Sequence, residues 1–362
     1  MKEDKQIRSV LKNTLRKRTI AIASFALGIA ATFGLFSLKI GWEGKTGRQL
    51  SGASPDDINL YEIKRLKGFK NIQPVVSIDP KMESTELTPL KNELINLIDS
   101  LKRVGTVTDV SVFLKNLRQG NWISINGDLS FHPASLMKVP LMLAVLKTAE
   151  ATPGLLEKKI VYQKHPNKNM LPQHFTAESI KEGKAYTVHE LIYYCIAHSD
   201  NHAAHALESN IQLGVVLKLF EDIGMPVPDL QNGDYTISAQ AYSTFMDAIF
   251  NSSFLSPEYS EYAAEMLVNS SFNAGFSKGI PKDVRSWRKF GEWVRPNAEV
   301  ELHESGTIFL DGKPYLLTVM TRGKELEGLS TVLQKTASLT TKHIIKHQYG
   351  IAKSNTRLTN GC

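Results

Sequence analysis

The pattern of apolar and polar positions predicts strands at both ends of a globular region. Residues 84–103 place apolar side chains three and four positions apart behind capping residues, which predicts a helix. Residues 106–127 predict two strands around a Gln-Gly turn. Toward the end of the chain the pattern predicts three strands and a last amphipathic helix, at 286–293, 301–312, 314–323 and 326–347.

The middle of this region has a helical pattern. A long apolar run follows Ser135, residues 186–209 are helical on both sides of "SDN", and residues 213–255 alternate helices with loops. Strands at both ends with helices between them predict an α/β (α+β) fold. We expect one antiparallel sheet built from both termini and flanked by helices, with an inserted all-helical lobe.

The first forty residues combine a basic segment with a long apolar run. Residues 19–38, "TIAIASFALGIAATFGLFSL", carry no charge and are long enough to cross a hydrocarbon core as a helix. Basic residues precede this run, so we expect a single-pass anchor over residues 19–40 with a cytoplasmic tail at 1–18. The rest of the chain would then be extracytoplasmic, in the periplasm or at the cell surface. A cleaved signal peptide is the alternative, although the run is long for one and no clear cleavage site follows it.

The remaining segments complete the expected organisation. Residues 41–84 mix Gly, Pro, Ser and charged residues and predict a linker, with a short strand at 73–78. The globular domain would occupy residues 85–348, and residues 349–362 would form a C-terminal tail.

Charge and cysteine content exclude several classes of protein. The 362 residues carry a net charge of +7, but residues 1–40 hold eight basic and two acidic residues. The rest has 35 basic and 34 acidic residues, so it lacks the basic surface that nucleic-acid binding requires. The two cysteines, Cys195 and Cys362, do not form a disulfide framework. We expect Cys195 to be a small buried apolar residue.

Ser135 and Lys138 are the first candidates for chemistry. Their spacing places both side chains on one face at the start of a long apolar helix. A serine hydroxyl needs an adjacent base to become a nucleophile, and a desolvated lysine has a lowered pKa and can serve as that base. Taken alone, the pair could also be an ordinary helix cap and a solvated lysine.

Two further clusters change this assessment. "SDN" at Ser199–Asn201 lies 64 residues after Ser135, and "KFG" at Lys289–Gly291 lies 90 residues further on. Their order resembles the S-x-x-K, S-D-N and K-T-G motifs of the serine penicillin-recognising enzymes. The flanking segments "FHPASLMKVPLM", "YTVHELIYYCIAHSDNHAA" and "GIPKDVRSWRKFGEW" resemble the class A β-lactamase family, in particular its β-lactamase-related serine hydrolase branch. The resemblance spans about residues 85–348.

The resemblance implies roles for the polar residues of these motifs. Ser135 would form an acyl-enzyme, Lys138 would take its proton, and Ser199 would relay that proton to the leaving nitrogen. The backbone N–H groups of Ser135 and Glu292 would form the oxyanion hole. No metal or organic cofactor is implied.

The same resemblance implies how a substrate is held. Asn201 would bind the substrate amide, and Lys289 would attract the substrate carboxylate and steady Ser199. Gly291 would belong to the strand that lines the substrate.

Two departures from the family pattern stand out. Phe290 replaces the Thr or Ser of the third motif, whose hydroxyl would bind the substrate carboxylate. No E-x-x-L-N segment, which would supply the deacylating base, occurs between Glu208 and Thr236. Asp229 and Asp234 in the equivalent loop are better explained as turn residues. We therefore expect an acyl-enzyme that forms and clears slowly.

Four histidines near the motifs need an interpretation. His198, His202 and His205 have a spacing that could hold zinc on a continuous helix, but "SDN" interrupts that helix and no acidic ligand accompanies them. We therefore expect no metal site there. His132, close to Ser135, is expected to shape the entrance of the site.

The sequence thus predicts a membrane-anchored, extracytoplasmic serine hydrolase that acts on β-lactam amide bonds through an acyl-enzyme. Two alternatives stay open: a penicillin-binding D,D-peptidase or esterase acting on cell-wall peptides, and a non-catalytic cell-wall binding module. The expected partners are a β-lactam or cell-wall peptide and the membrane, with no nucleic acid. The sequence leaves the oligomeric state open.

Overall fold

The computed structural model describes residues 60–164, 173–175, 178–211, 213–228, 235–294 and 299–359. The expected anchor at residues 19–40, as well as Asp229, Asp234 and Cys362, lies outside these ranges. Within them, no helix is both long enough and apolar enough to cross a membrane.

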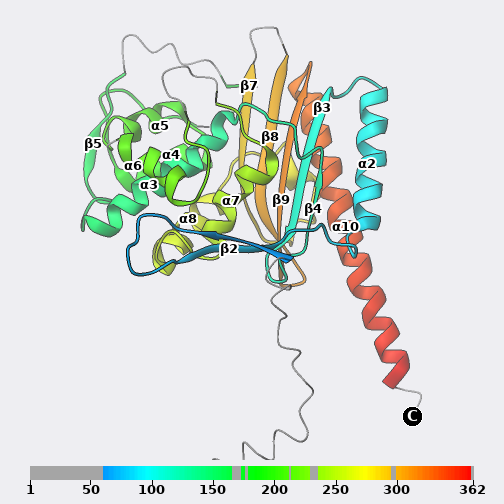
Figure 1. The fold of residues 1–362 in the computed structure, drawn as a ribbon. Helices are drawn as coiled ribbons and strands as arrows, with labels where there is room; N and C mark the ends of the chain where they lie inside the picture. Colours follow the sequence, from blue (N-terminus) through cyan, green and yellow to red (C-terminus); the bar gives the residue numbers. More distant parts are fainter. Residues whose placement is uncertain are drawn as a thin grey trace, which may run out of the picture. The chain divides into compact units, whose positions relative to one another are not determined.

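A five-stranded antiparallel sheet forms the centre of the described domain (Figure 1). Its order is β4-β3-β9-β8-β7, so the central strand β9 joins strands from the beginning and the end of the domain. The strands are β3 (Asp109–Asn116), β4 (Trp122–Ile125), β7 (Ser286–Val294), β8 (Val300–Leu310) and β9 (Lys313–Gly323). The predicted antiparallel sheet with flanking helices is confirmed.

Two long helices cover one face of the sheet, on the right of Figure 1. They are α2 (Thr88–Arg103) and α10 (Leu326–Thr359), and the short α9 (Phe276–Gly279) packs against α10. Val112, Leu317 and Val319 of the sheet form one core with this layer. α10 begins at the predicted residue and continues to Thr359, beyond the predicted end at 347 and into the segment predicted as a tail.

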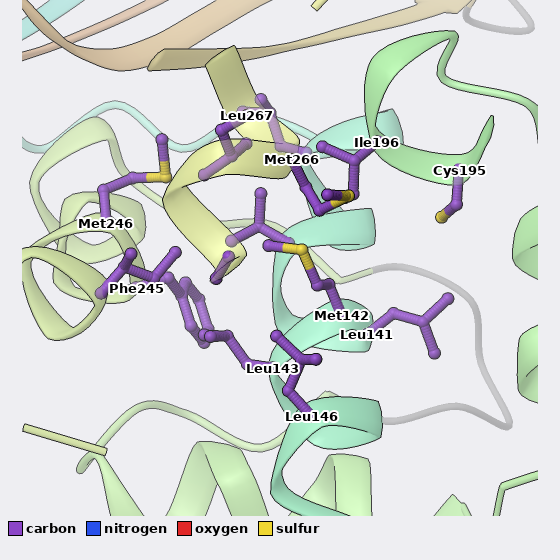
Figure 2. Packing of buried hydrophobic residues seen from close by; sticks show 14 of the residues in the cluster. Leu141, Met142, Leu143, Leu146, Cys195, Ile196, Phe245, Met246, Met266 and Leu267 are labelled. Atoms are coloured by element: carbon purple, nitrogen blue, oxygen red, sulfur yellow. The ribbon is translucent and has the colours of Figure 1, made fainter. Parts of the chain in front are cut away.

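A helical lobe lies on the other side of the sheet (Figure 1). It contains a short 3-10 turn, six helices and a two-stranded sheet: η2 (Ala134–Met137), α3 (Lys138–Ala151), α4 (Val188–Ala197), α5 (Asn201–Glu208), α6 (Leu213–Asp222), α7 (Ala239–Phe250), α8 (Pro257–Val268), β5 (Lys159–Val161) and β6 (Ala185–Thr187). Figure 2 shows Met142 of α3, Phe245 of α7 and Leu267 of α8 meeting in its core. Cys195 is a fully buried free thiol in the same core, as predicted, and burial raises its pKa to about 12.

The linker prediction is wrong where the described chain begins. Strands β1 (Tyr61–Arg65) and β2 (Val75–Pro80) form an antiparallel hairpin, and β2 overlaps the predicted short strand. Asp79 pairs with the buried ammonium of Lys115 at 2.5 Å, and Trp122 donates to the carbonyl of Pro80 at 2.6 Å. Val76 of β2 is buried, but Ile63 and Ile78 are exposed, so the apolar pattern of the hairpin gave little sign that it packs.

Candidate active site

A short turn presents the nucleophile at the start of α3. Ala134 adopts a left-handed backbone conformation with φ of 51°, and Ser135 follows within the 3-10 turn that leads into the helix. The Nζ of Lys138 lies 2.6 Å from the Oγ of Ser135 and 2.7 Å from the Oδ1 of Asn201. The three-residue spacing therefore brings the serine and lysine of the first motif into direct contact, as predicted.

The second motif interrupts the helical segment between α4 and α5. Ser199 has a φ of 56°, which turns the chain, and the Asp200 carboxylate then caps α5 by accepting the N–H of His202 at 3.0 Å. Asp200 also accepts the N–H of Ile180 at 3.0 Å. The Asp200 contacts hold the turn that positions Ser199 beside Lys289 and Asn201 beside Lys138.

The third motif lies on the edge strand β7 and completes the polar cluster. Lys289 points toward the helical lobe, where its Nζ donates to the Oγ of the fully buried Ser199 at 2.8 Å and to the carbonyl of Phe290 at 2.8 Å. The three motifs, 64 and 90 residues apart in the chain, thus meet in one place.

Gly291 allows the close approach of β7 to the nucleophile turn. A Cβ at this position would lie 2.9 Å from the carbonyl oxygen of Pro133 and 3.1 Å from the backbone nitrogen of Ser135. Any side chain here would push the strand away. The glycine therefore keeps the backbone of residues 291 and 292 beside the Ser135 N–H, as an oxyanion hole made of Ser135 and Glu292 requires.

Burial sets the protonation preference of both lysines. Burial lowers the pKa of Lys138, although nearby acidic groups oppose the shift. Burial, followed by the charge of Lys138, lowers the pKa of Lys289 well below its usual range. A neutral Lys138 amine beside Ser135 is the state that can accept a proton.

Phe290 packs into the core on the other face of β7, and the Nζ of Lys289 lies 4.4 Å from the centroid of its ring. Its ring is 1% exposed and stacks on Phe272, with centroids 4.2 Å apart and an angle of 16° between the ring planes. The ring of Phe175 meets it edge-on at 6.4 Å. Because successive residues of a strand face opposite sides, Phe290 leaves Lys289 and Gly291 in place.

A segment that the motifs did not reveal also reaches the nucleophile. Gln173 donates from Nε2 to the Oγ of Ser135 at 3.2 Å. The next two backbone N–H groups, of His174 and Phe175, donate to the carboxylate of Glu292. We call residues 173–175 the strap. The sequence offered one indication of this contact, the polar Gln173 in a loop 38 positions from Ser135. Because a loop residue has no fixed spacing to the motifs, this indication could not be used.

A cavity of about 670 Å³ opens at this cluster. Its polar lining comes from Ser135, Lys138, Gln173, Asn201, Glu208 and Glu292, together with the imidazoles of His132, His174 and His205. Its apolar lining comes from Ala134, Met137, Leu141, Ala204, Trp293, Val294 and Leu326. His132 stacks on Trp293 with ring centroids 4.2 Å apart, on the wall of the cavity.

The histidines around "SDN" do not assemble a metal site. His202 bonds through Nδ1 to the hydroxyl of Tyr162 at 2.5 Å, and His198 packs against the rings of Tyr193 and Tyr194. Among the residues that the structure describes, no three His, Cys, Asp or Glu side chains are grouped so that they could hold a metal ion.

The sequence matches a known protein family. Residues 89–344, well over half of the chain, match the family model described as the β-lactamase enzyme family. The chain belongs to this family. It is therefore a serine hydrolase of the β-lactamase-like type.

Solved structures of β-lactamases and of PBP-A share the fold. A single-residue mutant of PBP-A, determined as an acyl-enzyme complex with penicillin G, aligns at 20% identity with a TM-score of 0.59 over 72% of this chain and 97% of that chain. A β-lactamase from Chitinophaga pinensis aligns at 18% identity with a TM-score of 0.60 over 70% and 99%. An ancestral class A β-lactamase aligns at 20% identity with a TM-score of 0.58 over 69% and 99%. No curated protein matches the sequence.

Proposed function

We propose that this family member is a membrane-anchored, extracytoplasmic enzyme that opens β-lactam amide bonds through an acyl-enzyme on Ser135 and releases the product slowly. The observation that carries the proposal is the 2.6 Å contact between the Nζ of Lys138 and the Oγ of Ser135. Both side chains are almost fully buried, so the contact forms a base–nucleophile pair rather than a solvated surface pair. The charge-free segment at residues 19–38 supports the anchor.

The acylation step follows from the contacts. Neutral Lys138 takes the proton of Ser135 while the Oγ forms a bond to the carbonyl carbon and the C=O electron pair moves onto oxygen. The N–H groups of Ser135 and Glu292 stabilise this oxyanion. When the tetrahedral intermediate collapses, the C–N bond breaks and the leaving nitrogen receives a proton through the hydroxyl of Ser199. Lys289 holds that hydroxyl in position at 2.8 Å.

Deacylation needs a water molecule, a base and the return of the proton to Ser135. The described cavity wall contributes two carboxylates, Glu208 and Glu292. Burial raises the pKa of Glu292, but its carboxylate already accepts two backbone N–H groups of the strap, which leaves less of it free to position a water molecule. Together with the missing E-x-x-L-N segment, this supports a long-lived acyl-enzyme.

Phe290 favours a second candidate, an esterase. A member with the family pattern would offer a hydroxyl to a substrate carboxylate at this position, and here the side chain is a buried aromatic ring. The same acyl-serine chemistry would then act on an ester instead of a β-lactam ring.

Intact-protein mass spectrometry over time, with one penicillin and one cephalosporin, tests the proposal. We expect an adduct on Ser135 that persists after excess drug is removed. Ser135→Ala should abolish the adduct, whereas Ser130→Ala, at an exposed serine just before the same turn, should not. Rapid turnover without a lasting adduct would indicate an efficient β-lactamase. An adduct that survives in Ser135→Ala would refute the nucleophile assignment.

A further inference from the structure

Position 290 offers no hydrogen-bonding group to a substrate. In the family pattern this position offers a hydroxyl to a substrate carboxylate. Here the side chain is an aromatic ring that packs on Phe272 and Phe175, and the centroids of Phe175 and Phe272 lie 5.1 Å apart. A substrate carboxylate in the cleft would therefore lose part of its hydration without gaining that hydrogen bond.

The strap closes the same side of the cleft. Its backbone is held on the carboxylate of Glu292, on β7, and the imidazole of His174 contacts the carboxylate of Glu327 on α10 at 2.8 Å. The strap therefore links the edge strand β7 with the start of α10, next to the oxyanion hole. Two carboxylates, rather than cations, hold it there.

The cations near this side are already engaged. Lys289 is fully buried, and its Nζ donates to Ser199 and to the carbonyl of Phe290. Arg288 directs its guanidinium to the carboxylate of Glu304 at 2.9 Å and to the carbonyl of Phe272 at 3.1 Å. Of the described residues that line the cavity, Lys138 is the only lysine or arginine, and it serves the nucleophile.

The remaining wall favours apolar groups. Met137, Leu141, Trp293, Val294 and Leu326 line the cavity. Small-molecule sites commonly combine such apolar walls with polar groups that fix the orientation of the ligand.

From these contacts we infer that the cleft selects an uncharged acyl donor: an ester or amide with apolar substituents and no carboxylate beside the scissile bond. The inference rests on the proposed acyl-serine function and adds its substrate class. The negative charge of Glu292 beside the reacting carbonyl would repel a carboxylate there, and no hydroxyl at position 290 would replace the hydration that the carboxylate loses. Glu292 is thus proposed as a residue that determines specificity through its side chain.

Penicillin G and its methyl ester provide a matched pair of probes that differ in the carboxylate. The rate of Ser135 adduct formation is measured for both by intact-protein mass spectrometry on the full chain in detergent. We expect the wild-type protein to react faster with the methyl ester. In Glu292→Gln the ratio of the acid rate to the ester rate should rise on the order of tenfold, because one repulsive charge is removed while the acceptor oxygen for the strap is kept. Glu327→Gln, which removes an exposed carboxylate from the other contact of the strap, should leave this ratio unchanged.

The outcomes separate the two proposals. A wild-type protein that reacts with the free acid as fast as with the ester, or faster, would overturn the inference while the Ser135 adduct still supports acyl-serine chemistry. An unchanged ratio in Glu292→Gln would remove the role of its side chain. No adduct from either probe would overturn the proposed function, and the substrate class with it.

Discussion

Two neighbouring residues of strand β7, Lys289 and Phe290, pack on different sides of the sheet. Lys289 faces the helical lobe and joins Ser199 in the polar cluster around Ser135, whereas Phe290 faces the other side and packs on Phe272. One face of the strand retains the arrangement that an acyl-serine reaction needs, and the other face lacks the group that would bind a substrate carboxylate. Side chains alternate along a strand, but the Nζ of Lys289 lies 4.4 Å from the centroid of the Phe290 ring, so the two faces remain in contact at this point.

Removal of the base should produce the largest effect on the catalytic face. Lys138→Met should lower the rate of Ser135 acylation by about 10²–10⁴-fold, the usual contribution of a positioned general base. Its stability should change little, because methionine fills the same buried space without a charge. Adduct formation by mass spectrometry and thermal unfolding test both parts. Lys147→Met, at an exposed lysine of the same helix, is the matched control, and an equal loss of rate there would contradict the assignment.

Substitutions of Phe290, on the other face of β7, should change the stability of the protein. Phe290→Ala removes a fully buried ring from the stack and should reduce the free energy of unfolding by about 3–5 kcal/mol. Phe290→Leu keeps most of the volume and should cost much less. Urea unfolding of the three proteins measures both values. If alanine costs no more than leucine does, Phe290 is not part of a packed core.

The pH dependence of acylation tests the coupling between the two lysines. The base must be uncharged, so acylation should increase as the pH rises through the pKa of Lys138. The charge of Lys138 lowers the pKa of Lys289, and such an interaction is mutual, so Lys289→Met should move this increase to higher pH. At neutral pH the rate should also fall about 10- to 100-fold, since Ser199 loses a hydrogen-bond donor. A profile that keeps its midpoint would show that Lys289 does not act on Lys138.

The smallest predicted effect concerns the strap. Gln173→Ala removes the N–H donor that lies 3.2 Å from the Oγ of Ser135, and should slow acylation by about 2- to 10-fold, as expected for one uncharged hydrogen bond. The acylation rate at saturating probe is the measurement. A faster reaction would mean that the strap obstructs the cleft instead of supporting the nucleophile.

Much of the fold could be predicted because its elements have strong periodic patterns. The helix 84–103 corresponds to α2, and the three late strands correspond to β7, β8 and β9. The hairpin β1–β2 could not be predicted as part of the domain. Ile63 and Ile78 are exposed, and the hairpin attaches through Asp79 and Pro80, whose partners are distant in the sequence.

The candidate site also has one part that the sequence determines and another that only the folded structure determines. The types and order of Ser135, Lys138, Ser199 and Lys289 are properties of the sequence, because the chemistry requires those groups in those motifs. Their contact across 64 and 90 residues, the direction of the Phe290 ring and the strap on Glu292 are decided by the packing of β7 against the helical lobe and the nucleophile turn. A one-dimensional pattern specifies which face of a strand a residue occupies, but the neighbours on that face come from distant segments that only the folded chain brings together.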